Sequence, residues 1–440
     1  MSEASLNRRI AAIAVPAMLT VAAEPLYDLT DTAILGRLGT AQLGGAALAV
    51  AVLGLGYAVF IFLMFGTTGS VARLLGAGDP RAAVHRGVGA LWLGAGLGVV
   101  AALVLWPAAV PLLRLFGGRG RVLTEATTYF TVSLWGFPAF LVVMAGAGYL
   151  RGTADTRTPL LIALVSVALN LVGEVVLIIG LGFGVGASAG TTVAAKTFGA
   201  ALYVVLVARA ARHHRVPLGP DREVIAELGR AGWPLFIRTA SLRLALAVAY
   251  GTATGLGTVS LAAWAIVLQL WSFLAYVTDG LEVAGQALVG AAVGARDRES
   301  LRRIASRILL WACGLGAALG VGVIGLHRVL PELFTHDAAV VELAAGVLVW
   351  VGVTQPVNAV AFALDGILVG ADDLWFQAVA MTGAMVAFVP LAWWASSSAA
   401  TLGALYAAWS AFMVLRVVLL GTRLSAQLAR QRAGFRAVTR

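Results

Sequence analysis

The sequence has little charge, one cysteine and five histidines, and each shortage excludes a class of protein. Only 12% of the 440 residues are charged, whereas soluble domains carry about 25%, so an ordinary soluble enzyme and a disordered chain are excluded. The single cysteine, Cys313, permits no intramolecular disulfide, and the scattered histidines form no CxxC or HExxH metal site. Instead, 60% of the residues are hydrophobic and the mean hydropathy is +0.92, which indicates a polytopic membrane protein.

Twelve stretches are long and apolar enough to cross the hydrocarbon core, which needs about 20 mostly apolar residues. We therefore expect an all-α integral membrane fold with twelve transmembrane helices. No cleavable signal peptide is expected, because Arg8 and Arg9 precede a stretch that continues as a full span. The expected spans lie near residues 10–35, 44–70, 87–111, 123–149, 159–181, 187–208, 232–254, 259–293, 308–330, 340–369, 376–395 and 402–421.

Basic residues are distributed unequally between the connections. Twenty-two of the 31 Lys and Arg residues lie on the side that carries both termini, five lie on the opposite side and four lie inside spans. Because cytoplasmic loops are enriched in Lys and Arg, both termini are expected in the cytoplasm. The net charge of +10 is thereby explained as a topology signal, and no nucleic-acid partner is expected.

The second half of the chain repeats residues of the first half at one constant shift in residue number. We call this shift, which takes Pro16 to Pro234 and Asp79 to Asp297, the repeat offset. Since one repeat carries six expected spans, the two halves have the same orientation, as in transporters built from parallel repeats. We expect two six-helix lobes facing each other across a cleft. Their expected bounds are 1–208 for the N-terminal lobe, 209–230 for a cytoplasmic linker, 231–421 for the C-terminal lobe and 422–440 for a basic cytoplasmic tail.

Ionisable residues inside spans are costly in lipid and therefore indicate function. Seven acids against four bases leave the interior acidic, which favours cationic ligands or exchangeable protons. The acids are Glu24, Asp28, Asp31, Glu174, Asp279, Glu282 and Asp365, and the bases are Lys196, Arg238, Arg243 and Arg416.

Two groups of polar residues have the spacing of one helix face. Glu24, Asp28 and Asp31 share a face of the first span, where clustered carboxylates favour proton binding. The alternative is that Asp28 or Asp31 lies near the hydrated outer surface. Asn170 and Glu174, four residues apart, suit a proton or oxygen ligation of Na⁺, or else a purely structural hydrogen bond between helices.

The internal repeat distinguishes Asp31 and Glu174 from residues that recur in both halves. At the repeat offset, the equivalents of Asp31 and Glu174 are Ala249 and Ala392. The scaffold is doubled but this acidic chemistry is not, so we expect a coupling site in the N-terminal half alone.

The second half contains a different combination of charges. Arg238 and Arg243 are expected to neutralise Asp279 or Asp365 in a static buried ion pair, and Glu282 extends that network.

At these residues the chain resembles the MATE (multidrug and toxic compound extrusion) family, and within it the DinF-like bacterial branch. The resemblance extends over about 400 residues of the 440. The resembling segments are EPLYDLTDTAILGRLG (24–39), LRGTADTRTP (150–159), FIRT (236–239), LQLWSFL (268–274), QALVG (286–290) and LDGILVG (364–370).

The resemblance implies two six-helix lobes around a V-shaped central cavity, alternating access, and export driven by inward H⁺ or Na⁺. It implies a conformational hinge at Pro16. In the tenth helix, Asn358 replaces an acid that some relatives have, which weakens any Na⁺ site in that lobe. The implied ion-coupling residues are Asp31, Asn170, Glu174, Tyr129 and Thr192, with Thr191 as an alternative to Thr192; Na⁺ would bind at Asp31, Asn170 and Glu174. The candidate substrate-cavity residues are Glu24, Asp28, Asp279, Glu282, Asn358 and Asp365, of which Asp28 and Glu282 lie outside the family pattern.

We therefore expect a monomeric secondary antiporter of the bacterial plasma (inner) membrane. It would export amphipathic, mostly cationic compounds in exchange for H⁺ or Na⁺, with no cofactor, no resident metal and no enzymatic activity. A lipid or lipid-linked sugar flippase is the first alternative and would need a basic cavity. An integral membrane enzyme would need a converging nucleophile, base or metal set, and a passive channel would leave the doubled lobes unexplained.

Overall fold

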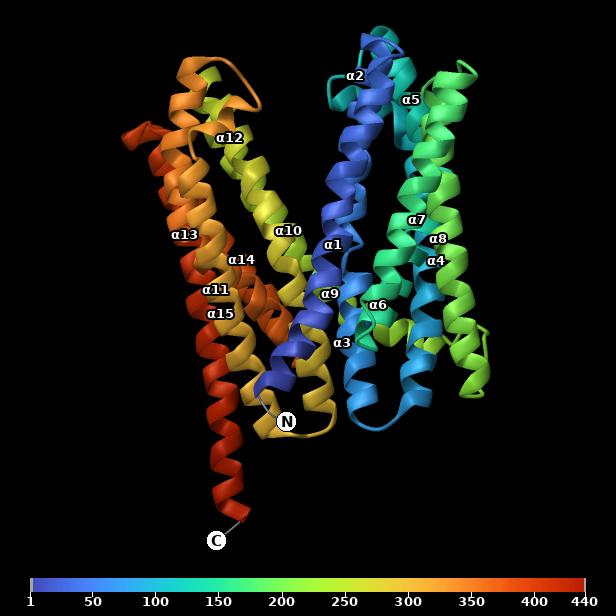
Figure 1. Ribbon diagram of the computed structural model, residues 1–440, viewed down its shortest axis with the longest axis vertical. Helices are drawn as coiled ribbons and strands as arrows, with labels where there is room; N and C mark the ends of the chain where they lie inside the picture. Colours follow the sequence, from blue (N-terminus) through green and yellow to red (C-terminus); the bar gives the residue numbers. More distant parts are fainter. Residues whose placement is uncertain (1–2, 439–440) are drawn as a thin grey trace. The chain divides into compact units, whose positions relative to one another are not determined.

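The computed structural model describes residues 3–438, with side chains for residues 3–21 and 31–429. This part of the chain is helical nearly throughout and contains no β-strand (Figure 1). The prediction of an all-α membrane fold is confirmed. The helices are α1 (Glu3–Gly36), α2 (Thr40–Val59), α3 (Phe62–Gly76), α4 (Pro80–Leu115), α5 (Gly120–Trp135), α6 (Phe137–Gly152), α7 (Arg157–Glu174), η1 (Val175–Gly180), α8 (Val185–His213), α9 (Arg222–Gly255), α10 (Thr258–Gly294), α11 (Arg298–Leu326), α12 (Val329–Glu332), α13 (Ala338–Gly370), α14 (Leu374–Trp394), η2 (Ala395–Ala399) and α15 (Leu402–Val438).

Most of the expected spans meet the length and hydropathy requirements for crossing a membrane. Within the described residues, nine helical segments are long and apolar enough, and α5 with α6, bent by 51°, makes a tenth. These ten correspond to ten of the twelve predicted spans. The other two, near 10–35 and 232–254, fall within α1 and α9, which are each 34 residues long.

The chain divides into two compact units. We call Leu19–Trp233 the N-terminal unit, and Met1–Met18 together with Pro234–Arg440 the C-terminal unit. Both boundaries fall inside helices, in α1 just after Pro16 and in α9 at Pro234. Each of these two helices therefore contributes residues to both units.

The internal repeat is visible in the packing within each unit. Gly98 of α4 packs against Pro138 of α6, and the equivalent Gly316 of α11 packs against Pro356 of α13. A Cβ atom at either glycine would lie within 3.0 Å of the proline backbone, so glycine is required for this close approach.

The repeat also extends to the ends of helices. Asp79 accepts a hydrogen bond from the backbone N–H of Ala82 at 2.8 Å and begins α4. The equivalent Asp297 accepts from the N–H of Ser300 at 2.9 Å and begins α11. Each aspartate satisfies an N–H group that the first turn of a helix leaves unpaired.

A wider helical turn occurs at related places in both units. Helix α7 ends at Glu174 and continues as the π-helix η1, and α14 ends at Trp394 and continues as the π-helix η2. Such segments are rare and are found frequently at functional sites. In the N-terminal unit the π-helix directly follows one of the predicted coupling residues.

Candidate functional site

The predicted coupling residues of the N-terminal unit come together from four helices. Asp31 lies on α1, Tyr129 on α5, and Asn170 and Glu174 on α7, opposite the first turns of α8. Close approach of α7 to α8 occurs at Gly173, where a Cβ atom would lie 2.8 Å from Thr191 Cγ2. The glycine next to Glu174 therefore lets this carboxyl group reach the side chain of Ser188 on α8.

A buried serine joins the two acids. Ser188 Oγ lies 2.9 Å from Asp31 Oδ1 and 3.2 Å from Glu174 Oε1. All three side chains are buried, with exposed fractions of 0%, 7% and 1% for Ser188, Asp31 and Glu174. Because both carboxyl groups contact the same hydroxyl, they lie close to each other.

This geometry suits a proton. A serine hydroxyl has one hydrogen and can donate to only one carboxylate at a time. The second contact becomes a hydrogen bond when the other carboxyl is protonated and donates to Ser188 Oγ. Two carboxylates that share one hydroxyl in a buried site repel each other when both are ionised, so one exchangeable proton between Asp31 and Glu174 would satisfy both contacts.

Asn170 completes the contact between α7 and α8. In the amide orientation that satisfies both of its atoms, Nδ2 donates to Glu174 Oε1 at 3.2 Å. Its oxygen then accepts from the backbone N–H of Thr192 at 3.0 Å and lies 3.1 Å from the Thr192 hydroxyl and 3.2 Å from that of Thr191. Both threonines thus contact Asn170, so the structure does not choose between them.

Tyr129 joins the same group of side chains. Its ring is 3% exposed, and its hydroxyl interacts with Thr192 within electrostatic range of Asp31 and Glu174. Ser188 was not identified from the sequence. Its position was nevertheless readable, because it lies three and four residues before the two threonines and therefore on the same face of α8.

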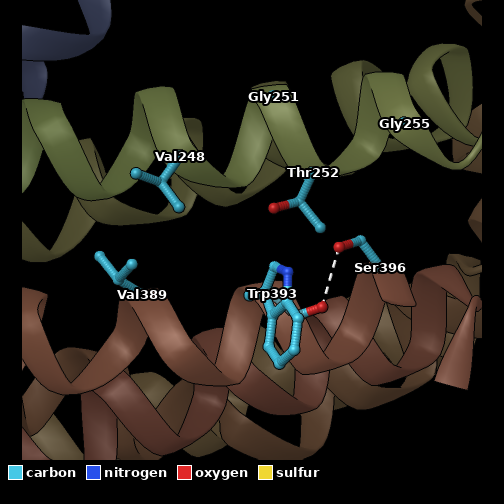
Figure 2. Close-up of a pocket in the computed structure, with 7 residues that line it drawn as sticks. All are labelled: Val248, Gly251, Thr252, Gly255, Val389, Trp393 and Ser396. Carbon is cyan, nitrogen blue, oxygen red and sulfur yellow. Dashed lines mark hydrogen bonds between the residues drawn. The ribbon is translucent and has the colours of Figure 1, made fainter. Parts of the chain in front are cut away.

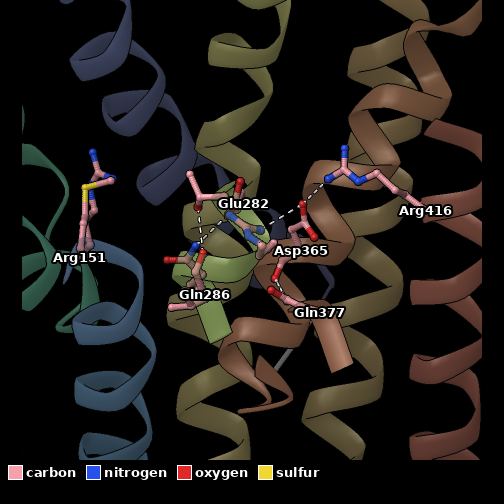
Figure 3. A network of polar contacts seen from close by, with 10 residues as sticks. Arg151, Glu282, Gln286, Asp365, Gln377 and Arg416 are labelled. Carbon is pink, nitrogen blue, oxygen red and sulfur yellow. Dashed lines mark hydrogen bonds and ion pairs between the residues drawn. The ribbon is translucent and has the colours of Figure 1, made fainter. Parts of the chain in front are cut away.

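The C-terminal unit contains a second buried polar cluster (Figure 3). Asp365 Oδ2 lies 2.6 Å from Arg416 Nη2 and 3.2 Å from Arg238 Nη1. Glu282 Oε1 lies 3.8 Å from Arg238 Nη2, so Glu282 extends the network as predicted. The prediction that Arg243 would take part is wrong, because Arg243 is exposed and Arg416 supplies the second guanidinium.

The other predicted residues whose side chains are described belong to the C-terminal unit. Asn358 is 3% exposed and donates to Gln355 Oε1 at 3.2 Å, and Asp279 is half-buried on α10. Pro16 is half-buried within the continuous helix α1. The side chains of Glu24 and Asp28 lie outside the described residues.

At the position in the C-terminal unit that corresponds to the acid pair, the chemistry is apolar. Ala249 and Ala392 replace the two acids and are both buried. Next to them, α9 and the end of α14 with η2 line a pocket of about 340 Å³ (Figure 2). Its lining residues are Val248, Gly251, Thr252, Gly255, Val389, Trp393 and Ser396, none of which is charged.

Within the described residues, no group of three or more His, Cys, Asp or Glu side chains is arranged to hold a metal ion. The oxygens that surround Asp31 and Glu174 come mainly from hydroxyl and amide groups. The arrangement therefore suits a proton, and a weakly held Na⁺ is the other ion that such oxygens can take.

Comparison with known proteins gives consistent matches over most of the chain. The sequence profile of the MatE family matches residues 16–176 and again residues 234–394, two ranges related by the repeat offset. Protein DETOXIFICATION 43 of Arabidopsis thaliana is 29% identical, with 87% of this chain and 84% of the relative covered. DNA damage-inducible protein F of Escherichia coli is 28% identical, with 92% and 89% covered. The solved structure of a MOP superfamily transporter from Pyrococcus furiosus superposes with a TM-score of 0.88 at 21% identity, covering 96% of each chain.

Proposed function

The chain belongs to the MatE family of multidrug and toxic-compound efflux transporters, and from that premise we propose that it is an antiporter driven by protons. It would export amphipathic organic cations of small size in exchange for H⁺. Members of this family are transporters and not enzymes. The protein spans the membrane several times, and its bacterial relatives together with the distribution of arginines support the bacterial plasma membrane with both termini in the cytoplasm.

One observation supports the choice of H⁺ over Na⁺ as the coupling ion. Ser188 lies within hydrogen-bond distance of Asp31 and Glu174 at once, and this is favourable only with one proton on the pair. Na⁺ is the alternative ion, and the oxygens of Asn170 and Glu174 would be its ligands together with Asp31. The contact of both acids with one hydroxyl favours the proton, because a cation would lie between the acids and separate them.

The proton would act by holding three helices together. Asp31 belongs to α1, Glu174 to α7 and Ser188 to α8, so the protonated pair links all three. Loss of the proton leaves two negative charges that repel, and α1 is then free to move away from α7. Coupling requires that the conformation with α1 close to α7 and the conformation with α1 moved away differ in proton affinity. We propose Pro16 as the hinge within α1, because proline removes a helical hydrogen bond.

The proposed substrate class follows from charge. Within the described part of the N-terminal unit, the side chains that contact Asp31 and Glu174 carry hydroxyl and amide groups. A deprotonated pair is therefore attractive to an organic cation, and a protonated pair is less so. This reciprocity is what exchange of a cation for a proton requires. We propose that the transporter works as a monomer, because each chain carries its own acid pair.

The test uses the purified protein in proteoliposomes with an imposed pH gradient, with and without Na⁺. Uptake of ethidium is compared between wild type, Asp31→Asn and the control Glu125→Gln, which removes a carboxylate of α5 outside the site. Transport driven by the gradient and lost only in Asp31→Asn supports the proposal. A requirement for Na⁺ would change the ion, and normal transport by Asp31→Asn would refute the role of the acid pair. Movement of labelled lipid instead of ethidium would identify a flippase.

A further inference from the structure

The two arginines of the C-terminal cluster are shared unequally between its acids. Asp365 Oδ2 contacts Arg416 at 2.6 Å and Arg238 at 3.2 Å. Of these two arginines, Arg238 alone forms an ion pair with Glu282 in the part of the chain that the structure describes, and its distance of 3.8 Å is beyond that of a hydrogen bond. Asp365 therefore receives most of the neutralising charge, although Glu282 is equally buried at 3% exposure.

The charges facing Glu282 do not balance. Among the described residues they are Arg238 from α9, Asp279 from α10, Asp365 from α13 and Arg416 from α15, while the neutral Gln377 of α14 contacts the Asp365 carbonyl. With every one of these groups ionised, three acids, Glu282 included, are close to two arginines. Asp279 is half-buried and can keep its charge in contact with water. The unbalanced charge then falls on Glu282, and a buried group in that position tends to become neutral.

A neighbouring amide gives independent evidence for a proton. Gln286 lies one helical turn after Glu282 on α10 and is 0% exposed. Its Nε2 donates to Glu282 Oε1 at 3.2 Å, but its own oxygen has no hydrogen-bond partner among the described residues. An ionised carboxylate can only accept and cannot satisfy that oxygen. A protonated carboxyl can do so, because it accepts from the amide N–H and donates its O–H to the amide oxygen.

From this geometry we propose that Glu282 is a second proton-binding site, located in the C-terminal unit and separate from the pair of Asp31 and Glu174. Gln286 is the group that stabilises the protonated form. The proposal rests on contacts within the C-terminal unit and stands independently of the ion that the N-terminal unit uses.

The proton controls which acid holds Arg238. When Glu282 is protonated, Arg238 is committed to Asp365 at 3.2 Å. When the O–H bond breaks, the proton leaves to water as hydronium, and the new carboxylate competes for the guanidinium group. Because Arg238 lies on α9, proton loss is transmitted to that helix.

The repeat shows that this acid is not needed to pack the helices. At the repeat offset, the equivalents of Glu282 and Gln286 are Met64 and Thr68. Gly366 packs on the backbone of Glu282 just as the equivalent Gly148 packs on the backbone of Met64. The backbone contact is common to both units, whereas the acid and amide occur only in the C-terminal one, so they serve chemistry and not packing.

Infrared difference spectroscopy of the full-length protein in lipid, recorded across a pH titration, tests the proposal. The carbonyl band of protonated carboxyl groups is compared in wild type, Asp31→Asn/Glu174→Gln, and the same background with Glu282→Gln added. We expect the band to persist when the N-terminal pair is removed and to disappear with Glu282→Gln. Glu342→Gln, at an exposed position of α13, is the control and should leave the band unchanged.

A second variant keeps the test decisive if Glu282→Gln does not fold. Gln286→Met removes the amide and should shift the band to higher frequency, because the acid loses its hydrogen-bond partner. No band in the background lacking the N-terminal pair, or a band insensitive to both Glu282→Gln and Gln286→Met, would overturn the proposal. A weaker wild-type band on removing Asp31 and Glu174 bears on the N-terminal pair alone, so the two proposals fail separately.

Discussion

Ser188→Ala should weaken proton binding by the acid pair without removing either acid. In the singly protonated pair the hydroxyl donates to one carboxyl and accepts from the other, at 2.9 and 3.2 Å. In the doubly ionised pair it can only donate. The variant therefore costs the protonated state one more hydrogen bond than the ionised state, and such a bond near a charged group contributes about 1–2 kcal/mol.

This difference corresponds to a loss of proton affinity of about 5- to 30-fold. The pH at which proton-driven ethidium transport is half-maximal should therefore move about 1 unit toward acid. The assay is transport in proteoliposomes over a series of pH values at a constant gradient. Ser133→Ala, at a buried serine on α5 of the same unit, is the control for loss of a buried hydroxyl.

The result that would refute this reasoning is an unchanged pH profile for Ser188→Ala at equal reconstituted amounts. It would mean that the two acids hold the proton without help from the Ser188 hydroxyl. A shift toward alkaline pH would contradict the assignment more strongly, because it would mean that the hydroxyl stabilises the ionised pair.

Three further outcomes concern the C-terminal unit. Gly366→Ala should destabilise the protein by about 1–3 kcal/mol in a thermal-shift assay in detergent, because a Cβ atom at this position meets the Glu282 backbone. Gly383→Ala, in open space on α14, is the control and should be nearly neutral. Equal stability of the two variants would contradict the packing. Arg416→Leu should cost about 3–5 kcal/mol by leaving Asp365 poorly neutralised, and Arg416→Leu/Asp365→Leu should recover part of it, so additive losses would argue against a buried ion pair. Hydrogen bonds from Ser300 lower the pKa of Asp297 below its usual 3.8, so its capping contribution is present above that value and lost as the pH falls further; Asp297→Asn should reduce the acid sensitivity of thermal unfolding, and identical acid profiles would rule the cap out.

Much of the fold was predictable because membrane helices leave long apolar runs. Spans near 87–111 and 340–369 fall within α4 and α13. The run near 44–70, however, is two helices, since α2 ends at Val59 and α3 begins at Phe62. Hydropathy does not report such breaks, because an interrupted helix keeps the same composition. The membership of residues 1–18 in the C-terminal unit was equally invisible, as it depends on contacts with helices of the other half of the chain.

The candidate site shows the same limit at the level of side chains. Asn170 and Glu174 were paired from their spacing, because four residues bring side chains to one face of a helix. Arg243 was paired with Arg238 although five residues turn a helix by about 140°, so both cannot face the same partner. Arg416 is 51 residues from Asp365 and gave no signal of its contact. Local periodicity predicts which residues share a face, and tertiary packing decides what that face meets.

The division of α1 between two units also sets an order of assembly during synthesis. Leu6, Ile10 and Ile13 are made before the whole N-terminal unit, yet they are buried against Leu281, Leu288 and Ile367 of the C-terminal unit. The apolar side chains of this segment are therefore covered only after α10 and α13 have been inserted. The N-terminal unit likewise needs the chain to be made as far as Trp233, inside α9. If synthesis stopped between residues 209 and 230, both units would be incomplete. The two units therefore complete their folding only after the second half of the chain has been made, and not one half after the other.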